Sequence, residues 1–149
     1  MTKVRLTKKY SFEMAHALKD YDGLCRHIHG HSYTLEITVV GTPLDDEGHP
    51  KNGMVMDFKD LKKIVKSQIV EKFDHALVMS AKSNPKLIEA LQEDGHKLIL
   101  TDYQPTCELM LLDYVEVVKS QLPAHVSLLS MRLHETQTSF AEWFAADND

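Results

Sequence analysis

The sequence predicts an α+β fold in which helices cover one face of a four-stranded antiparallel sheet. In several segments apolar residues alternate with polar ones, as in half-buried strands, and in others they recur every three or four residues, as in amphipathic helices. These segments follow the order strand, strand, helix, helix, strand, helix, strand, which is typical of an α+β layer. With 149 residues and no internal repeat or linker, the chain is expected to form one domain over residues 1–149.

Two long strands open the chain. Over residues 4–16 the even positions are mostly apolar and the odd ones mostly polar, which predicts a strand that ends in His16. The segment from Lys19 to Gly30 contains Asp and Gly residues and follows neither period, so we expect a loop. Apolar residues share one parity again over about 31–41, which predicts the second strand.

Two helices are expected in the middle of the chain. Asp57 is a typical N-cap residue, and the apolar residues after it form a helical stripe beside several lysines, which predicts a helix over residues 58–71. Asn84 followed by Pro85 is a helix-start signal, so a second, short helix is expected over residues 85–93.

A short strand, a third helix and a last strand complete the pattern. The short strand is expected at residues 96–100, and the helix is expected to begin after Thr106, a second capping residue. Apolar residues at spacings of three and four, beginning with Cys107, place one face of this helix in the core until Pro123 ends it. The last strand is expected over residues 126–135. Three aromatic residues of the tail are expected to pack on the body of the domain: Phe140, Trp143 and Phe144.

The predicted sheet has free edges, because four strands cannot close into a barrel within one chain. Cytosolic proteins usually cover or pair such edges. We therefore expect the chain to oligomerise through strand pairing.

The composition argues against several classes of protein. With 17 Lys and Arg against 22 Asp and Glu, the net charge is −5, which does not favour binding to nucleic acid or to an anionic membrane. No stretch has the length and apolarity of a membrane span, and the first ten residues are basic without the apolar region of a secretion signal. Two cysteines are too few for a disulfide scaffold. These features predict a cytoplasmic location.

A cluster of histidines predicts a metal site. In His29-Gly30-His31 the two imidazoles lie two residues apart at the start of a strand, so they point to the same side. A third histidine on that face would complete a three-histidine zinc site whose fourth position is open to water or substrate. His16, at the end of the neighbouring strand, is the first candidate, and His27 is a competitor. The alternative is a chance H-x-H pair of ordinary, hydrogen-bonded histidines.

The two cysteines have different surroundings. Cys25 lies in a polar loop beside Arg26 and His27, where positive charge favours the thiolate. This environment is typical of a base or a nucleophile. Cys107, on a buried helical stripe, is better explained as a small hydrophobic residue.

Two carboxylates are further candidates for the site. Asp74 directly precedes His75, and a carboxylate beside an imidazole can set its tautomer and basicity for proton transfer. A helix-end histidine with a capping aspartate is the more common explanation of this pair. Glu135 shares the parity of the apolar residues of the last strand, so its carboxylate is expected toward the apolar face, where it needs N–H donors. If the strand has already ended, Glu135 is solvated instead.

In their order and spacing these elements resemble the 6-pyruvoyl-tetrahydropterin synthase family. The resemblance runs from residue 4 to about residue 139. It rests on the segments Phe12-Glu13-Met14-Ala15-His16, Cys25-x-x-x-His29-Gly30-His31-Ser32-Tyr33, Asp74-His75, Pro105-Thr106-x-Glu108 and Glu135-Thr136. Within the family, the chain is most similar to the 6-carboxy-tetrahydropterin synthase branch of queuosine biosynthesis.

The resemblance implies a tunnelling fold, or T-fold. In this fold three subunits join their four-stranded sheets into a barrel, and two barrels stack into a homohexamer with active sites at subunit interfaces. The resemblance also implies Zn²⁺ as cofactor, held by His16, His29 and His31.

The resemblance further assigns roles to the other site residues. Cys25 would be a general acid/base helped by Asp74 and His75. Glu135 would anchor the amino-pyrimidine edge of a pterin substrate. Two further residues would lie near the same pocket: Thr106 and Glu108.

The implied reaction is that of a zinc-dependent carbon–carbon lyase. It converts 7,8-dihydroneopterin triphosphate to 6-carboxy-5,6,7,8-tetrahydropterin, acetaldehyde and triphosphate. Two alternatives stay open: formation of 6-pyruvoyl-tetrahydropterin, and binding of a metal or a pterin without turnover. A zinc hydrolase is disfavoured, because no H-E-x-x-H motif or comparable glutamate base accompanies the histidines.

The chain departs from the family pattern in three places. The connection over residues 76–104 is longer than in compact members, Cys107 stands where a serine is expected, and His134 stands where Lys or Arg is frequent. The residue that contacts the triphosphate stays open among three basic residues: Lys19, Arg26 and Arg132.

Overall fold

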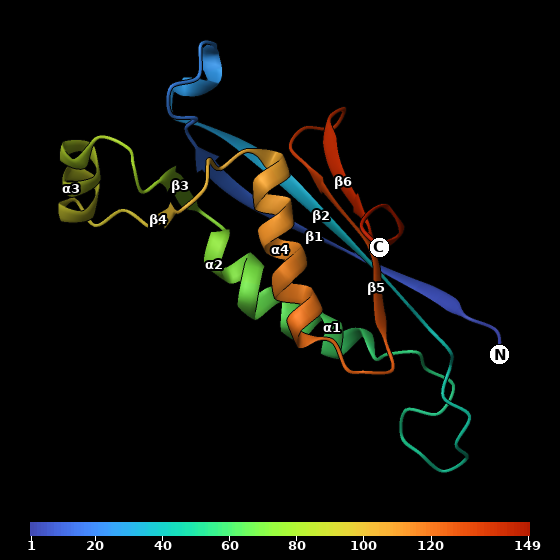
Figure 1. The fold of residues 1–149 in the computed structure, drawn as a ribbon. Coiled ribbons are helices and arrows are strands. Elements are labelled where there is room, and N and C mark those ends of the chain that lie inside the picture. Colours follow the sequence, from blue (N-terminus) through green and yellow to red (C-terminus); the bar gives the residue numbers. More distant parts are fainter.

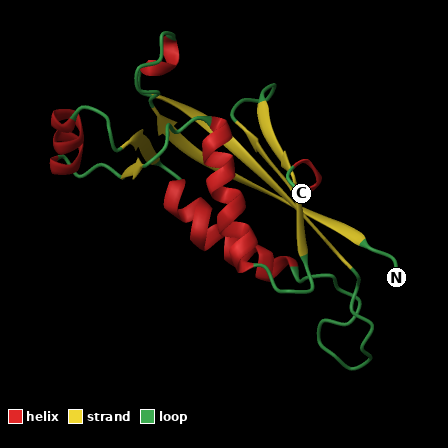
Figure 2. Ribbon diagram, viewed as in Figure 1, coloured by secondary structure: helices red, strands yellow, loops and turns green.

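The computed structural model describes all residues 1–149 and shows one mixed sheet of six strands with helices on one of its faces (Figures 1 and 2). The strands lie side by side in the order β4-β3-β1-β2-β5-β6. Their bounds are β1 (Val4–His16), β2 (His29–Gly41), β3 (Ala76–Ser80), β4 (Leu98–Thr101), β5 (Ser127–His134) and β6 (Phe140–Phe144). The predicted α+β class is confirmed, but the sheet has more strands than the four expected.

A long antiparallel hairpin of β1 and β2 forms the centre of the sheet. Pairing runs without interruption from Val4 opposite Gly41 to His16 opposite His29. Every second residue of β2 from Tyr33 to Val39 is fully buried on the face that packs against the helices. Because β2 begins at His29, two residues earlier than predicted, both histidines of the H-x-H pair belong to the strand.

The fourth antiparallel strand comes from the tail of the chain rather than from residues 96–100. β5 pairs with β2 and β6 pairs with β5, both antiparallel, so that β1, β2, β5 and β6 form the antiparallel set. Trp143 packs against the core from β6, while Phe140 and Phe144 lie on the other face of the sheet, 48% and 37% exposed. The tail aromatics therefore divide between the two faces, because side chains alternate along a strand.

β3 and β4 extend the sheet with parallel pairs. β3 pairs with β1 only at Met14–His16, and β4 pairs with β3 at the edge. The strand predicted at residues 96–100 is thus an edge strand at Leu98–Thr101, outside the antiparallel set. β3 was not predicted, because Ala-Leu-Val-Met-Ser is a short apolar run without alternation.

Two long helical segments cover one face of the sheet (Figure 2). The helix predicted over residues 58–71 runs to Phe73 in three consecutive parts: α1 (Phe58–Val65), a π-helical turn η2 (Lys66–Val70) and α2 (Glu71–Phe73). Asp57 caps its start by accepting a hydrogen bond from the amide of Lys59 (2.9 Å). The second segment is α4 (Cys107–Gln121), which Thr106 caps as predicted.

The core lies between these helices and the sheet. Its largest fully buried side chains include Tyr33, Tyr114, Leu35, Ile37, Leu61, Ile69, Met110 and Met131. None of the helices combines the length and the apolarity that crossing a membrane requires.

α3 (Pro85–Glu93) stands apart from this layer. It lies beyond β3 and β4, and none of its residues is buried (Figure 1). Asn84 caps it by accepting a hydrogen bond from the amide of Lys86, as the Asn-Pro signal predicts. Two short 3₁₀ turns complete the chain: η1 (Leu24–Arg26), in the loop between β1 and β2, and η3 (Ala145–Asp147).

Candidate functional site

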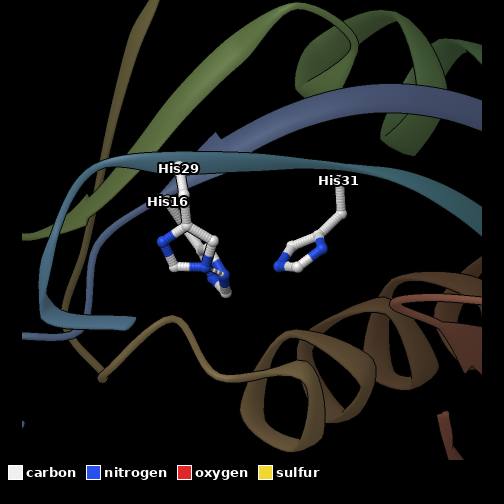
Figure 3. Close-up of side chains that lie close together, drawn as sticks. All are labelled: His16, His29 and His31. Atoms are coloured by element: carbon white, nitrogen blue, oxygen red, sulfur yellow. Dashed lines mark hydrogen bonds between the residues drawn. The ribbon is translucent and has the colours of Figure 1, made fainter. Parts of the chain in front are cut away.

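Three imidazoles converge where β1 ends and β2 begins. His16 lies opposite His29 in the hairpin, and His31 follows His29 on the same face. One ring nitrogen from each of the three lies within 4.8 Å of the others. Figure 3 shows the rings projecting from the two strands toward one another. The sheet therefore brings together the three histidines that the sequence singled out.

Hydrogen bonds to backbone carbonyls fix the orientation of two of these rings. Nδ1 of His16 donates to the carbonyl of Pro105 (2.7 Å), and Nδ1 of His29 donates to the carbonyl of His27 (2.6 Å). A carbonyl oxygen can only accept, so each Nδ1 carries the proton and each Nε2 is left with a lone pair. These two Nε2 atoms lie 3.1 Å apart. Two facing lone pairs at this distance require a proton or a metal ion between them.

The third imidazole has an unsatisfied nitrogen. Nε2 of His31 is buried and has no hydrogen-bond partner, and its nearest carboxylate oxygen, on Glu135, is 3.7 Å away. Burial is the largest cause that lowers the pKa of His16, so this imidazole is neutral near pH 7, the form that binds a metal. Three imidazole nitrogens within this distance fit zinc, which is often bound by three protein ligands where the fourth position is left for water or substrate.

His27 does not compete for the third position. It offers its backbone carbonyl to the ring of His29, and its side chain is not one of the three that cluster. The third ligand is therefore His16, whose place is fixed by the pairing of β1 with β2.

Glu135 lies beside the histidines, in the turn between β5 and β6. Its amide donates to the carbonyl of Ser139 (3.0 Å), and its side chain is only 28% exposed. β5 ends at His134, one residue earlier than predicted, so Glu135 follows the strand, but its side chain is partly buried rather than fully solvated. A carboxylate in this position can accept two N–H donors from a ligand that reaches the histidines.

The first turn of α4 borders the same region. Pro105 accepts the hydrogen bond from His16, and the hydroxyl of the next residue, Thr106, accepts one from the amide of Leu109 (3.2 Å). The hydroxyl of Thr106 is thus used as a helix cap. Glu108 is exposed in the first helical turn, where its charge complements the helix dipole.

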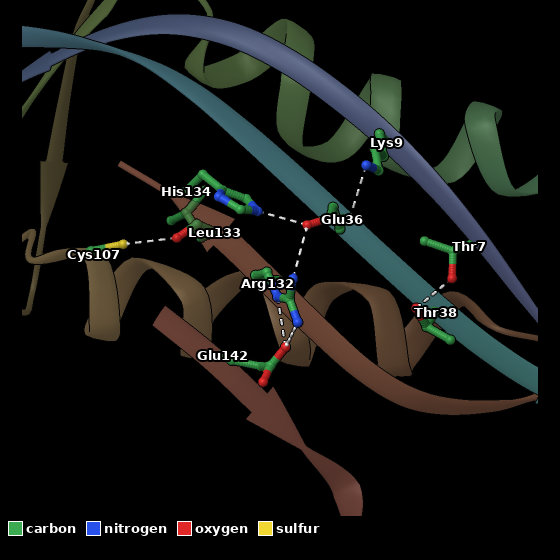
Figure 4. A network of polar contacts seen from close by, with 9 residues as sticks. All are labelled: Thr7, Lys9, Glu36, Thr38, Cys107, Arg132, Leu133, His134 and Glu142. Carbon is green, nitrogen blue, oxygen red and sulfur yellow. Dashed lines mark hydrogen bonds and ion pairs between the residues drawn. The ribbon is translucent and has the colours of Figure 1, made fainter. Parts of the chain in front are cut away.

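The two cysteines differ as the sequence suggests. Cys107 is buried, its thiol donates to the carbonyl of Leu133 (3.3 Å; Figure 4), and burial raises its pKa to about 11. Cys25 is half-buried in η1, in the loop that joins β1 to β2. Burial is the largest cause that raises the pKa of Tyr33, and the nearby groups Glu135, Cys107 and Cys25 raise it further.

Asp74 and His75 lie beside β1, directly before β3 begins. His75 lines a shallow cavity of about 330 Å³ with residues of both parities of β1 and β2, among them Glu13, Ser32 and His31. One carboxylate oxygen of Asp74 accepts a hydrogen bond from the amide of Glu13 (2.8 Å), and the other lies 3.0 Å from Nδ1 of His75. The hydrogen bond from Glu13 is the main cause that lowers the pKa of Asp74. Within one chain, neither Asp74 nor His75 belongs to the cluster of three histidines.

The helix-free face carries an ionic network that sequence analysis missed. Glu36 accepts a hydrogen bond from Nε2 of His134 (2.6 Å) and lies 3.5 Å from the ammonium of Lys9 (Figure 4). Arg132 donates to Glu142 on β6 through its Nε (2.6 Å). Lys9 and Glu36 are direct cross-strand partners, so the register of the hairpin was the signal that could have revealed them.

Comparison with known sequences agrees with this arrangement. The sequence profile described as "6-pyruvoyl tetrahydropterin synthase" matches residues 5–146. The chain belongs to the 6-pyruvoyl tetrahydropterin synthase family. Within this family, the chain is 35% identical over 141 residues to the 6-carboxy-5,6,7,8-tetrahydropterin synthase of Haemophilus influenzae, covering 93% of this chain and 97% of that protein. It is 30% identical over 143 residues to the protein of the same name from Rickettsia typhi, covering 93% and 99%.

Solved structures show the same fold. An uncharacterized protein from Wolinella succinogenes superposes with a TM-score of 0.79 at 18% identity, covering 97% of this chain and 99% of that one. The 6-pyruvoyl tetrahydropterin synthase of Caenorhabditis elegans superposes with a TM-score of 0.65 at 24% identity, covering 97% of both chains. The T-fold implied by the sequence motifs is therefore confirmed for this member of the 6-pyruvoyl tetrahydropterin synthase family.

Proposed function

We propose that this protein is a zinc-dependent 6-carboxy-5,6,7,8-tetrahydropterin synthase. It converts 7,8-dihydroneopterin triphosphate to 6-carboxytetrahydropterin, acetaldehyde and triphosphate, a reaction of queuosine and 7-deazapurine biosynthesis in the cytoplasm. The names of the relatives from Haemophilus influenzae and Rickettsia typhi support this product. The observation that carries the proposal is the convergence of three ring nitrogens within 4.8 Å, two of them with lone pairs fixed by backbone carbonyls.

His16, His29 and His31 would hold the zinc ion. When bound, zinc supplies positive charge that stabilises negative charge on a substrate oxygen. The hydrogen bonds to Pro105 and His27 keep the Nε2 atoms of His16 and His29 aimed at the ion, so the ligands need no rearrangement on binding.

Glu135 and Cys25 would act on the substrate itself. The carboxylate of Glu135, next to His31, would accept two hydrogen bonds from the amino-pyrimidine edge of the pterin and so fix the ring. The thiol of Cys25 would move a proton to and from the hydroxyl-bearing carbon of the side chain. Thr106, beside Pro105, and Glu108 would border the pterin pocket, Thr106 through its backbone because its hydroxyl caps α4.

Asp74 and His75 would come from a neighbouring subunit. They are not part of the histidine cluster of their own chain, and we propose that they assist Cys25 across a subunit interface. The sheet offers the edges that such an assembly needs, because residues 4–13 of β1 pair with β2 on one side and with no strand on the other, and β6 has a partner on one side only. We propose a homohexamer of two stacked barrels, with each active site between subunits.

The test is incubation of the zinc-loaded protein with 7,8-dihydroneopterin triphosphate, followed by mass identification of the products. Acetaldehyde together with 6-carboxytetrahydropterin is the expected result. A product that keeps the three-carbon side chain would show the 6-pyruvoyl activity instead. Absence of turnover on any reduced pterin, with zinc bound, would leave a binding module and refute the enzymatic proposal.

The role of Cys25 is tested in the same assay. We expect Cys25→Ala to retain zinc and to lose turnover at least a hundredfold, because general acid–base catalysis typically contributes about 10²- to 10⁴-fold. Cys107→Ala is the matched control, because this buried thiol is bonded to Leu133 and its pKa is raised to about 11. Equal turnover by the two variants would remove Cys25 from the mechanism.

A further inference from the structure

The elbow between α2 and β3, which carries Asp74 and His75, has an unusual backbone. The helix ends at Phe73, Asp74 is extended, and His75 has a φ of +61° before β3 begins at Ala76. A positive φ is uncommon for residues with a Cβ atom and persists only where the surrounding structure holds it. The orientation of the Asp74 and His75 side chains therefore depends on the contacts that hold this elbow.

β1 holds one side of the elbow. The amide of His75 donates to the carbonyl of Glu13 (2.5 Å), and the amide of Glu13 donates to the carboxylate of Asp74 (2.8 Å). These bonds satisfy the amide of His75 and one carboxylate oxygen of Asp74. They leave the carbonyl groups at the end of the helix without a partner from β1.

Lys97 holds the other side. Its ammonium group donates to the carbonyls of Glu71 and Asp74, each at 2.7 Å. The last carbonyls of a helix have no partner within the helix, and positive charge is favourable at this end of the helix dipole. The backbone of Lys97 is fixed as well, because its carbonyl accepts a hydrogen bond from the amide of Leu77 (2.9 Å).

Lys97 belongs to the connection between β3 and α4. Lys97 lies after α3 and immediately before β4. α3 buries no residue, so this helix contributes nothing to the core. Through Lys97, the connection between β3 and α4 contacts the elbow that carries Asp74 and His75, the two residues proposed to assist proton transfer.

We propose that Lys97 is a positioning residue that fixes Asp74 and His75 in the geometry needed for proton transfer. This inference rests on the proposed function, since Lys97 acts only through these two side chains and touches no substrate. Without the ammonium group of Lys97, the carbonyls of Glu71 and Asp74 lose the hydrogen bonds that hold the end of the helix next to His75.

The experiment compares three variants with the parent protein, all loaded with zinc. Lys97→Met removes the charge and the donors, and Lys97→Arg keeps both. Lys86→Met is the matched control, because Lys86 lies in the same segment, on α3, and its side chain makes no hydrogen bond or ion pair. Hydrogen exchange of the His75 amide is measured by NMR without substrate, and kcat and KM are measured with 7,8-dihydroneopterin triphosphate.

We expect Lys97→Met to accelerate exchange of the His75 amide at least tenfold, because the amide's bond to Glu13 opens more often. We expect kcat to fall roughly 10- to 100-fold with KM within about threefold, since misplacing a catalytic group affects the chemical step more than binding. Lys97→Arg restores both readouts, Lys86→Met changes neither, and the zinc content is the same in all.

Unchanged exchange in Lys97→Met would overturn the inference, as would a loss of kcat that Lys97→Arg fails to restore. An inactive parent protein would refute the proposed function, and with it the catalytic purpose of Lys97. The exchange measurement separates the two failures, because it reports on the elbow without substrate.

Discussion

Replacing Tyr33 with Phe is expected to leave the free energy of unfolding unchanged or to raise it by about 1 kcal/mol. The ring of Tyr33 is fully buried, stacked on Phe12 and edge-on to His16 and His31, with centroid separations of 5.5, 6.3 and 5.6 Å. Its hydroxyl is buried without a hydrogen-bond partner. An unpaired buried hydroxyl costs about 1–3 kcal/mol, and Phe removes it while keeping the ring contacts.

Two other tyrosines serve as comparisons for the Tyr33→Phe variant. Tyr114 is also fully buried with an unpaired hydroxyl, so Tyr114→Phe is expected to behave like Tyr33→Phe. The hydroxyl of Tyr103 donates to Asp113 (2.7 Å), so Tyr103→Phe is expected to lower the free energy of unfolding by about 1 kcal/mol.

The assay is urea unfolding of the metal-free variants at one protein concentration, since the proposed assembly would make stability depend on concentration. A difference of about 1 kcal/mol corresponds to roughly 2–4 °C in Tm for a chain of this size. If Tyr33→Phe lost as much stability as Tyr103→Phe, the hydroxyl of Tyr33 would have a partner and the reasoning would be refuted. Zinc affinity is a second measurement. We expect Tyr33→Phe to keep the zinc affinity of the parent protein. We expect Tyr33→Leu, which has no ring against His16 and His31, to weaken zinc binding about tenfold.

Two further predictions concern the metal centre and the ionic network. His29→Ala is expected to abolish stoichiometric zinc binding, measured by metal analysis, whereas His27→Ala keeps it because His27 offers only its backbone carbonyl; loss of zinc in both variants would contradict this. Burial alone would raise the pKa of Glu36, but the hydrogen bond from His134 and the nearby Lys9 and Arg132 lower it below its ordinary value of 4.5. Stability from this carboxylate is therefore present above about pH 4.5 and is lost as the pH falls through the lowered pKa, so urea unfolding of Glu36→Gln should show a weaker loss toward acid than the parent protein.

Local patterns were sufficient for the central hairpin and for the helix starts. The alternation over residues 4–16 places His16 on the buried face of the first strand, and the spacing of His29 and His31 places these two on one side of the second strand. The capping residues Asp57, Asn84 and Thr106 mark helix starts, because a side-chain oxygen there satisfies a free amide within the same turn.

The sequence did not predict which strands pair at the two edges of the sheet. The tail at Phe140–Phe144 became an antiparallel strand beside β5, and residues 98–101 became a parallel edge. Whether a short apolar segment pairs, with which neighbour and in which direction, depends on hydrogen bonds to distant residues. The same limit explains the π-helical turn at Lys66–Val70, which the stripe of apolar residues did not predict.

By itself the sequence determined the His29-Gly30-His31 pair, the distinction between Cys25 and Cys107, and the family motifs, since each is a matter of residue type and spacing along the chain. Only the tertiary structure decided that His16 and not His27 completes the histidine cluster, and that Lys97 hydrogen-bonds the carbonyls of Asp74 and Glu71 from 23 and 26 residues away. Periodicity fixes the face of a side chain within its own element. Which elements meet, and which orphaned carbonyl a distant ammonium group reaches, is set by the packing of the whole chain.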